Sequence, residues 1–428
     1  SPDGLNASAH TPEQRRRALT LLARGATRHP TIAAELDRAV QAADLELLGV
    51  AIDVATQVEE PYALTSAIGR AAEGRPTSEI AALLAAVPDE TVALAEMAAR
   101  MARQTIAELP EPEQQSLDDV AAAIDCSNRF SDAGWSVEAA DSAQVAVDRL
   151  RLRPALEASS PYLLGRALTN LSNRLWELGE ISESIAPARE AVARLDEATA
   201  PANDRAAARS NLAFRLSEGG YGEEALAAAR DAEAILAEFG EDDSPALGRT
   251  HGSILNNLTC VLLSTGNPAS AVEYGTRCVA LRRSQALRSR DRFLPFLARA
   301  LVNAAPAAES ADHPDLADRL LGEGRSLHQL TGQRAPIFRF EEAESSILAA
   351  LIALHRSDWT SAKTAAGQAR LALDSIPLDL RQLTARLGAT IGRVQAAATA
   401  HERLAILDVA TGHHHGLSLP RLLEYRDL

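Results

Sequence analysis

The feature that most constrains this chain is a segment that recurs along its second and third quarters. Four copies align, each anchored on an asparagine, and the anchors lie 41, 46 and 46 residues apart. The anchors are Asn170, Asn211, Asn257 and Asn303. Two weaker copies keep the phase, one at Asp125 and one at Leu348. A fixed period of this length predicts a chain built by stacking copies of one supersecondary unit.

Other positions follow the anchor in phase. Nine residues after it come types that suit a helix end or a turn, namely Gly134, Gly179, Gly220, Gly266, Asp312 and Ser357. Fourteen residues after it every side chain is small, at Ala139, Ser184, Ala225, Ala271, Ala317 and Ala362. Twenty-one residues after it the same holds, at Ala146, Ala191, Ala232, Cys278, Gly324 and Ala369. We therefore predict helical hairpins that turn at the glycine position, with small residues on the second helix allowing close packing.

Three motifs carry a resemblance to a known family: the N-L pairs Asn170-Leu171, Asn211-Leu212 and Asn257-Leu258, the turn glycine, and the stretch Glu224-Ala225-Leu226. The pattern resembles the tetratricopeptide repeat, in a long-period style found in bacterial and, from its composition, actinobacterial-like proteins. The resemblance implies an all-α fold, an α-solenoid of stacked antiparallel hairpins wound as a right-handed superhelix. Since the period of that family is about 34 residues, the surplus predicts helices longer than the family norm.

The resemblance also predicts the domain organisation. Residues 117–373 form the repeat array, residues 1–116 a helical region that is either divergent repeats or a cap, and residues 374–428 a capping helix and tail. The apolar period predicts one long helix over residues 378–400. Because the chain does not begin with Met, we expect it to be a piece of a longer protein.

Composition excludes several classes of function. The formal net charge of −15 argues against a general nucleic-acid binder, which needs a basic face to neutralise phosphates. No run of about 18 uncharged apolar residues offers a membrane span. The cysteines Cys126, Cys260 and Cys278 are too scattered for a disulfide framework, so we expect reduced, buried thiols and a cytoplasmic location.

Motifs for catalysis or cofactor binding are absent from the sequence. It contains no phosphate-binding loop, nucleophile elbow or zinc-ligand spacing, so we expect no cofactor and no metal. The tract His413–His415 is interpreted as a polar loop. The acidic group Glu341, Glu342 and Glu344 is interpreted as a solvated helix start, where carboxylates favour the helix dipole.

The resemblance places ligand contacts on the first helix of each hairpin, around the N-L pairs. The candidate residues there are Arg166, Asn170, Asn173, Asn211, Asn256, Asn257, Arg299 and Asn303. Asparagine offers both a donor and an acceptor, which suits the backbone of an extended peptide, and arginine can fork onto a carboxylate. An alternative holds for the recurring anchors, which could instead bond neighbouring repeats and set their register. A clamp built from lysines is disfavoured, because the only lysine is Lys363.

The leading hypothesis is a scaffold that binds a peptide or partner protein in its concave groove, as the sensor or regulatory arm of a bacterial signalling or defence system. One alternative is an enzyme on a helical solenoid, with His, Asp and Glu side chains converging in the groove. Another is a peptide-sensing regulator that binds DNA through residues 1–110, whose low basic content argues against direct DNA contact.

Overall fold

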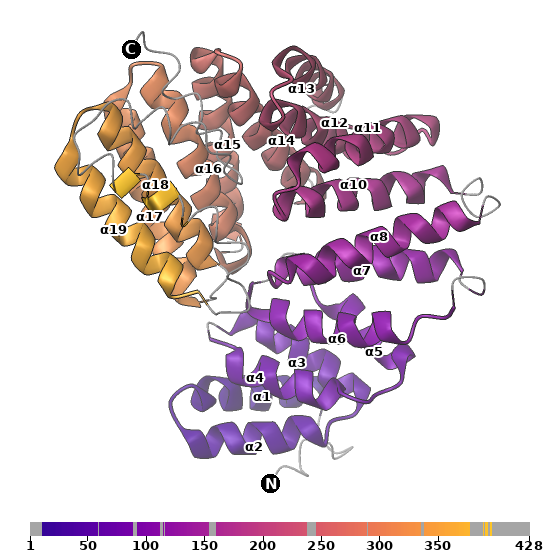
Figure 1. The fold of residues 1–428 in the computed structure, drawn as a ribbon. Helices are drawn as coiled ribbons and strands as arrows, with labels where there is room; N and C mark the ends of the chain where they lie inside the picture. Colours follow the sequence, from indigo (N-terminus) through magenta and orange to yellow (C-terminus); the bar gives the residue numbers. More distant parts are fainter. Residues whose placement is uncertain are drawn as a thin grey trace. The chain divides into compact units, whose positions relative to one another are not determined.

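The computed structural model describes residues 11–58, 60–88, 92–111, 114, 116–153, 160–237, 245–288, 290–334, 338–376, 388, 390–392 and 394–395. The described part of the chain is helical and holds no strand. Its earlier helices are α1 Pro12–Ala26, α2 Pro30–Gln41, α3 Leu45–Gln57, α4 Tyr62–Ala72, α5 Thr77–Ala86, the 3-10 turn Val92–Leu94, α6 Ala95–Ala107, α7 Leu117–Asp132 and α8 Ser136–Leu152 (Figure 1). The later helices are α10 Pro161–Glu177, α11 Ile181–Glu197, α12 Ala202–Glu218, α13 Gly222–Ala237, α14 Pro245–Ser264, α15 Pro268–Arg288, α16 Arg290–Ser310, α17 Pro314–Arg334, α18 Phe338–His355 and α19 Trp359–Asp374.

The chain packs as two compact units. Unit 1 is Ser1–Arg153 and holds α1 to α8, and unit 2 is Pro154–Leu428 and holds α10 to α19. The division falls one hairpin later than residue 117, where the sequence predicts that the array begins. The α7–α8 hairpin therefore keeps the phase of the repeat but packs within unit 1.

Unit 1 is built around large aliphatic side chains. Its helices α1 to α6 have 10 to 15 residues each, and the side chains of Leu36, Leu48, Leu64 and Ile68 are fully buried between them. The first helix begins at a capping box, in which the Thr11 hydroxyl accepts from the Gln14 backbone N–H. Burial of a Leu or Ile contributes about 1.5–3 kcal/mol, so this core rests mainly on the hydrophobic effect.

The described part of unit 2 holds five hairpins, α10–α11, α12–α13, α14–α15, α16–α17 and α18–α19, and the two helices of each pair pack extensively on one another (Figure 1). The turn position nine residues after each anchor has a positive φ at every copy, from +61° at Ser357 to +87° at Gly179. In each turn the next backbone N–H donates to the carbonyl five residues earlier, as from Glu180 to Leu175 and from Tyr221 to Leu216. Such bonds close a helix in the left-handed conformation that glycine adopts most easily. The predicted turn position is confirmed.

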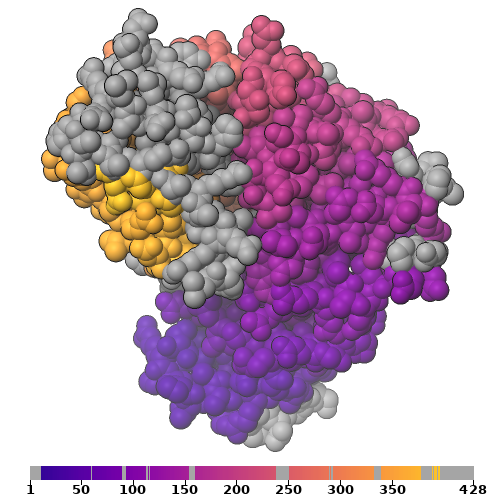
Figure 2. Space-filling model, viewed as in Figure 1, coloured from indigo at the N-terminus to yellow at the C-terminus, as the bar shows by residue number. Residues whose placement is uncertain are grey.

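The two small-residue positions are also confirmed. Ala139, Ser184, Ala225, Ala271, Ala317 and Ala362 are all fully buried. At the second position, a Cβ added to Gly324 of α17 would lie 2.8 Å from Val302 Cγ2 of α16. The backbones of the two helices in a hairpin therefore lie close together, because the residues between them are small. Figure 2 shows that side chains fill the space between the successive ribbons of α10 to α13.

The residues by which this period exceeds the family period of about 34 lie within the helices. Those of unit 2 have 16 to 21 residues, and the longest are α15, α16 and α17. The predicted capping helix at 378–400 falls largely outside the described residues, as does His413–His415. Across the part that is described, no helix is both long enough and apolar enough to cross a membrane.

Candidate binding face

The predicted ligand residues lie on the first helices of the hairpins of unit 2. On α10, Arg166, Asn170, Asn173 and Glu177 succeed one another at intervals of four and three residues, so they share one stripe of the helix. The same stripe of α12 carries Asn211, Arg215 and Glu218. Corresponding stripes follow on α14, α16 and α18. We call the surface made by these five stripes the first-helix face.

Asparagine amides link neighbouring helices across this face. Asn211 Nδ2 donates to Asn173 Oδ1 at 3.2 Å, and Asn257 Nδ2 donates to Asn211 Oδ1 at 3.3 Å, which connects α10, α12 and α14. Asn303 Nδ2 donates to Asn256 Oδ1 at 3.1 Å, which connects α16 to α14. The anchors Asn211, Asn257 and Asn303 therefore bond neighbouring repeats, as the register alternative requires. We call these five residues the asparagine row.

The amides of the row keep hydrogen-bonding capacity beyond these contacts. Asn173, Asn211, Asn256 and Asn257 are only partly buried, whereas Asn303 is buried. Each amide carries two N–H donors and an oxygen with two lone pairs, and the bonds between helices use part of that set. Arg166 and Asn170, on the same stripe of α10, are also partly buried. The structure thus places the predicted residues of α10 to α16 on one face.

Charged side chains lie beside the row on α10 and α12. Arg174 is buried and its Nη1 donates to both carboxylate oxygens of Glu177, at 2.8 and 2.9 Å. Arg215 is 4% exposed, donates to Asn173 Oδ1 at 2.9 Å, and lies over the Trp176 ring with 4.7 Å between guanidinium carbon and ring centroid. Burial lowers the pKa of Arg215 to about 9.

A second charged group lies on α16, α17 and α18. Arg299 donates to Glu341 Oε1, and His328 Nε2 lies 3.7 Å from Glu341 Oε2. Glu341 is buried, so the interpretation of this acidic stretch as a solvated helix start is wrong. Glu341 and Glu344 are three residues apart on α18 and face the same side, towards Arg299, whose charge acts on both. Arg299 donates from one guanidinium nitrogen to a carboxylate, and that carboxylate belongs to its own chain.

Two electrostatic interactions link the two charged groups. The charge of Glu218 on α12 acts on Glu344 on α18, and the charge of Glu177 on α10 acts on Arg299 on α16. Electrostatic coupling of this kind falls off within about 10 Å. Side chains of the first, second, fourth and fifth hairpins of unit 2 are thus electrostatically coupled. We call Arg174, Glu177, Arg215, Glu218, Arg299, His328, Glu341 and Glu344 the charged cluster.

Burial shifts the pKa values of this cluster. It raises the pKa of Glu218 to about 8, and it raises that of Glu344 well above the ordinary value, with repulsion from Glu341 adding to the effect. It lowers the pKa of His328, so this imidazole is neutral at pH 7. The pKa of Glu341 is low despite its burial, because Arg299 and His328 stabilise the carboxylate.

A family profile described as tetratricopeptide repeat matches residues 252–284, which span most of α14 and α15. That segment is one hairpin of the array, and the phased turns and small positions extend the same pattern over the other hairpins. The chain is a tetratricopeptide-type repeat protein. No curated protein matches this chain.

Several solved structures are similar to this tetratricopeptide-type protein. A putative kinesin light chain with nearly identical repeats from Podospora anserina is 19% identical over 51% of this chain and 99% of its own, with a TM-score of 0.37. The apo form of RapI is 15% identical over 67% of this chain and 92% of its own, with a TM-score of 0.48. A Rap protein complexed with competence and sporulation factor is 11% identical over 83% and 100%, with a TM-score of 0.45. Identities below 20% with TM-scores below 0.5 do not extend to function.

Sequence reasoning missed most of the charged cluster of this repeat protein. One signal was present, because Arg174 and Arg215 lie four residues after their anchors and Glu177 and Glu218 seven after them, in the phase of the repeat. No sequence signal connects these residues to Glu341, Glu344 or His328, because the two sets lie on different hairpins. Glu344 belongs to a helix more than 120 residues away from α12.

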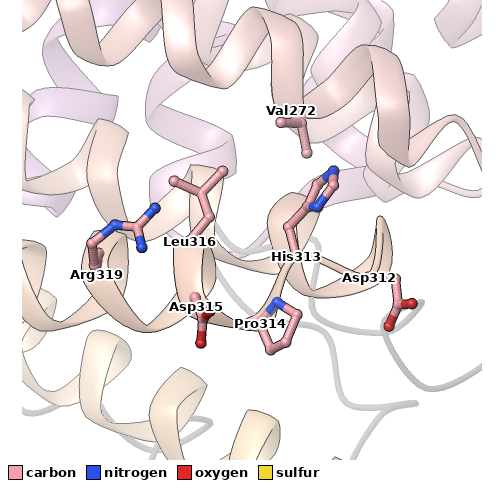
Figure 3. A pocket seen from close by; sticks show the side chains of 7 residues that line it. All are labelled: Val272, Asp312, His313, Pro314, Asp315, Leu316 and Arg319. Atoms are coloured by element: carbon pink, nitrogen blue, oxygen red, sulfur yellow. The ribbon is translucent and has the colours of Figure 1, made fainter.

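A pocket of about 480 Å³ lies away from this face, at the turn between α16 and α17 (Figure 3). Val272 and Leu316 line it with His313, and Asp312 and Asp315 point away from the histidine. Its polar residues Asp312, His313, Asp315 and Arg319 are exposed. The described residues contain no group of three or more His, Cys, Asp or Glu side chains that could hold a metal ion.

Proposed function

We propose that this repeat protein binds an extended peptide, or an extended segment of a partner protein, along the first-helix face of unit 2. The observation that carries the proposal is the asparagine row, in which partly exposed amides lie in register across α10, α12, α14 and α16. An extended backbone presents alternating N–H and C=O groups, and an amide is the side chain that can both donate to one and accept from the other.

The bonds between helices favour this function, because they hold the amides in place before a ligand arrives. A side chain that is already ordered loses little rotamer entropy on binding, which otherwise costs about 0.5–1.5 kcal/mol for each immobilised side chain. The register role of the anchors and the binding role of the row are therefore compatible. Arg299 and Arg215 flank the row, where they limit which ligand side chains are accepted.

The test is retention of peptides from a random library of acetylated, amidated hexapeptides, followed by fluorescence polarisation with one retained peptide. In the double variant Asn173→Ala/Asn211→Ala we expect Kd to rise about tenfold to thirtyfold, since two hydrogen bonds of about 1 kcal/mol each are lost. The matched control is Asn203→Ala, on the same helix α12 but outside the row. Equal affinities of the two variants would remove the row from the binding site.

An enzyme is the second candidate, and one observation favours it: the buried His328 imidazole lies 3.7 Å from Glu341 Oε2, and Glu344, whose pKa is raised by burial, lies one turn further along α18. A neutral imidazole and a protonated carboxyl group are the pair that acid–base catalysis uses. Both ring nitrogens of His328 are closed to solvent, however, and burial raises the thiol pKa of Cys126 to about 12 and that of Cys278 to about 11. These thiols stay protonated and are poor nucleophiles, so binding accounts for more of the geometry.

A role as the sensor or regulatory arm of a bacterial signalling or defence system is the finer form of the proposal. A binding face built on one unit of a repeat array is what such an arm needs. Sequencing the natural reading frame tests it, because an effector domain on the same chain would support the arm and a frame no longer than this sequence would count against it.

A further inference from the structure

Three amides of the asparagine row form one hydrogen-bonded chain. Asn211 Nδ2 donates to Asn173 Oδ1 at 3.2 Å, and Asn257 Nδ2 donates to Asn211 Oδ1 at 3.3 Å. Asn303 and Asn256 form a pair of their own. Both bonds in the chain of three run the same way, from an amide nitrogen to the oxygen of the amide on the preceding first helix. We call Asn173, Asn211 and Asn257 the linked amides.

The direction of these bonds is fixed by Arg215, whose Nη2 donates to Asn173 Oδ1 at 2.9 Å. A guanidinium group has N–H donors and no acceptor, so the atom of Asn173 that faces it is the oxygen. Asn211 then presents its nitrogen to that oxygen and its own oxygen to Asn257. Turning any one amide by 180° would bring two nitrogens or two oxygens together. The three amides therefore keep a single orientation.

Arg215 is not held in place by an ion pair. The residue is 4% exposed, and within the described part of the chain no carboxylate pairs with it and its enclosed Nε has no hydrogen-bond partner. Its guanidinium carbon lies 4.7 Å from the centroid of the Trp176 ring, against which Phe214 packs edge-on with 5.4 Å between centroids. Charged side chains are rarely buried unless they are paired. A buried cation bonded to an amide oxygen instead indicates a role in orienting that amide.

The hydrogen bonds use different atoms at the two ends of the linked amides. Asn173 Oδ1 accepts two bonds, which fill its two lone pairs, while its Nδ2 donates to no described residue. At Asn257 the reverse holds. Its Nδ2 donates to Ser210 Oγ at 3.0 Å as well as to Asn211, which uses both N–H groups, and its oxygen accepts from no described residue. The linked amides thus offer donors at α10 and an acceptor at α14.

This difference limits how an extended peptide can lie on the face. Asn173 can bond only to an acceptor of the ligand, and the charge of Arg215 beside it disfavours an ammonium group there. Asn257 can bond only to a donor, and Asn211 keeps one N–H and one lone pair for either. Packed helices lie about 8–10 Å apart, and an extended chain covers about 3.3 Å per residue. A segment of about five or six residues therefore reaches from α10 to α14.

We propose that Arg215 is a positioning residue that gives the linked amides one polarity, so that a bound peptide places a carbonyl oxygen on Asn173 and a backbone N–H on Asn257. The inference rests on the proposed function, since it concerns the same peptide on the same face. Because Arg215 itself is enclosed, it acts on the ligand through Asn173.

The test exchanges the two terminal amides for carboxylates. Asn173→Asp keeps the oxygen that accepts from Asn211 and Arg215, and it replaces the free N–H donors by a second oxygen. Asn257→Asp keeps the free oxygen, and it replaces the nitrogen that donates to Asn211 and Ser210. Thermal melting measures the stability of each variant. Fluorescence polarisation measures Kd for one peptide retained from the library of acetylated, amidated hexapeptides.

The two variants are expected to separate stability from binding. Asn173→Asp should melt no lower than the wild type but raise Kd tenfold or more, because an oxygen then faces the ligand carbonyl. Asn257→Asp should melt lower by about 3 °C or more, because an oxygen then faces Asn211 Oδ1, and it should weaken binding less than Asn173→Asp does. The control Asn203→Asp adds the same charge on α12 outside the row and should leave Kd unchanged.

A second pair of variants separates positioning by Arg215 from packing. The side chains introduced by Arg215→Lys and Arg215→Met are both long enough to cover the Trp176 ring, but only lysine can donate to Asn173 Oδ1. We expect Arg215→Lys to keep Kd within about threefold of the wild type and Arg215→Met to raise it about tenfold. Equal Kd values for these two variants would overturn the positioning role.

The remaining outcomes distinguish this inference from the proposed function. A loss of stability in Asn173→Asp together with a greater loss of affinity in Asn257→Asp would mean the opposite polarity. That result, or equal losses of affinity in the two variants, would overturn the inference and leave the proposed function standing. Retention of no peptide by the wild type would overturn both.

Discussion

Units 1 and 2 are both all-helical, but they bury different kinds of side chain. Around α1 to α6 the core mixes large aliphatic residues such as Leu48 and Ile68 with alanines, and among the described residues of unit 1 none that is buried as a whole is charged. Unit 2 combines alanine with Leu and Ile in the same way, but it also buries Arg174, Arg215 and Glu341.

The difference is that unit 2 buries charged side chains, which lowers its stability, whereas unit 1 does not. Charged groups cost several kcal/mol to bury and are kept only when paired or when they serve binding. Unit 1 follows the pattern of a region selected for stability alone. Unit 2 keeps charged and amide side chains along one face, which is the face that we propose binds peptide. The following changes test this contrast, in order of decreasing expected effect.

The largest effect is expected from a cavity in unit 1. Ile68→Ala removes a fully buried side chain, and we expect the free energy of unfolding to fall by about 2–5 kcal/mol. Hydrogen exchange measured by mass spectrometry should show loss of protection in α1 to α6. The control is Leu21→Ala on α1, where the side chain is 71% exposed and a change within about 0.5 kcal/mol is expected. Equal losses for the two variants would contradict an aliphatic core.

In unit 2 the corresponding test adds a methyl group. Gly324→Ala places a Cβ 2.8 Å from Val302 Cγ2 and 3.1 Å from the Ala298 carbonyl oxygen, so we expect a loss of about 1–2 kcal/mol. Gly322→Ala lies half a turn away on the same helix, where a Cβ would meet nothing within 4 Å. There we expect a gain of about 0.5–1 kcal/mol from helix propensity. Thermal melting measures both, and two gains would refute the close approach of α16 and α17.

The third test is the pH dependence of stability. Glu218 and Glu344 have higher pKa values in the folded than in the unfolded state, so the folded state binds more protons. Their contribution to stability is complete below the ordinary pKa of 4.5 and is lost as pH rises to about 8. In Glu218→Gln, we expect the fall in unfolding free energy between pH 5 and 8 to be smaller by on the order of 1 kcal/mol, after discounting for partial exposure. Urea titrations at both pH values, with Glu342→Gln as the control, measure the difference. An identical slope for the wild type and Glu218→Gln would place Glu218 in water.

The smallest effect is expected at the repeat turn. Ser357 has a φ of +61° where most copies have glycine, so Ser357→Gly should relieve strain and stabilise the protein by about 0.5 kcal/mol. Gly220→Ala, at a φ of +84°, should have the opposite sign with a somewhat larger size, about 1 kcal/mol. The melting temperature of each variant is compared with that of the wild type. Shifts of the same sign in both variants would contradict a common turn conformation.

The sequence predicts the architecture of unit 2 well, because the signals are local. A residue at a positive φ and a small residue five or twelve positions later each reflect one turn or one helix pair, so they recur with every hairpin. The short helices α1 to α6 carry no such phase, and their packing order could not be read from the pattern of apolar residues alone.

The site is less predictable, because it depends on contacts between hairpins. The asparagine row follows the repeat, so Asn211, Asn257 and Asn303 were found as a column. Glu341 looks like part of a solvated helix start when α18 is considered by itself. It becomes buried because Arg299 of α16 and His328 of α17 pack against it, and no spacing in the sequence records that arrangement.

The most direct test of the central claim, that the first-helix face of unit 2 binds peptide, is photo-crosslinking with a hexapeptide retained from the library and carrying a benzophenone side chain. The account predicts that mass spectrometry finds the crosslinks on α10, α12, α14, α16 or α18, and that excess unlabelled peptide suppresses them. Crosslinks confined to unit 1 or to α11, α13, α15, α17 and α19 would contradict it.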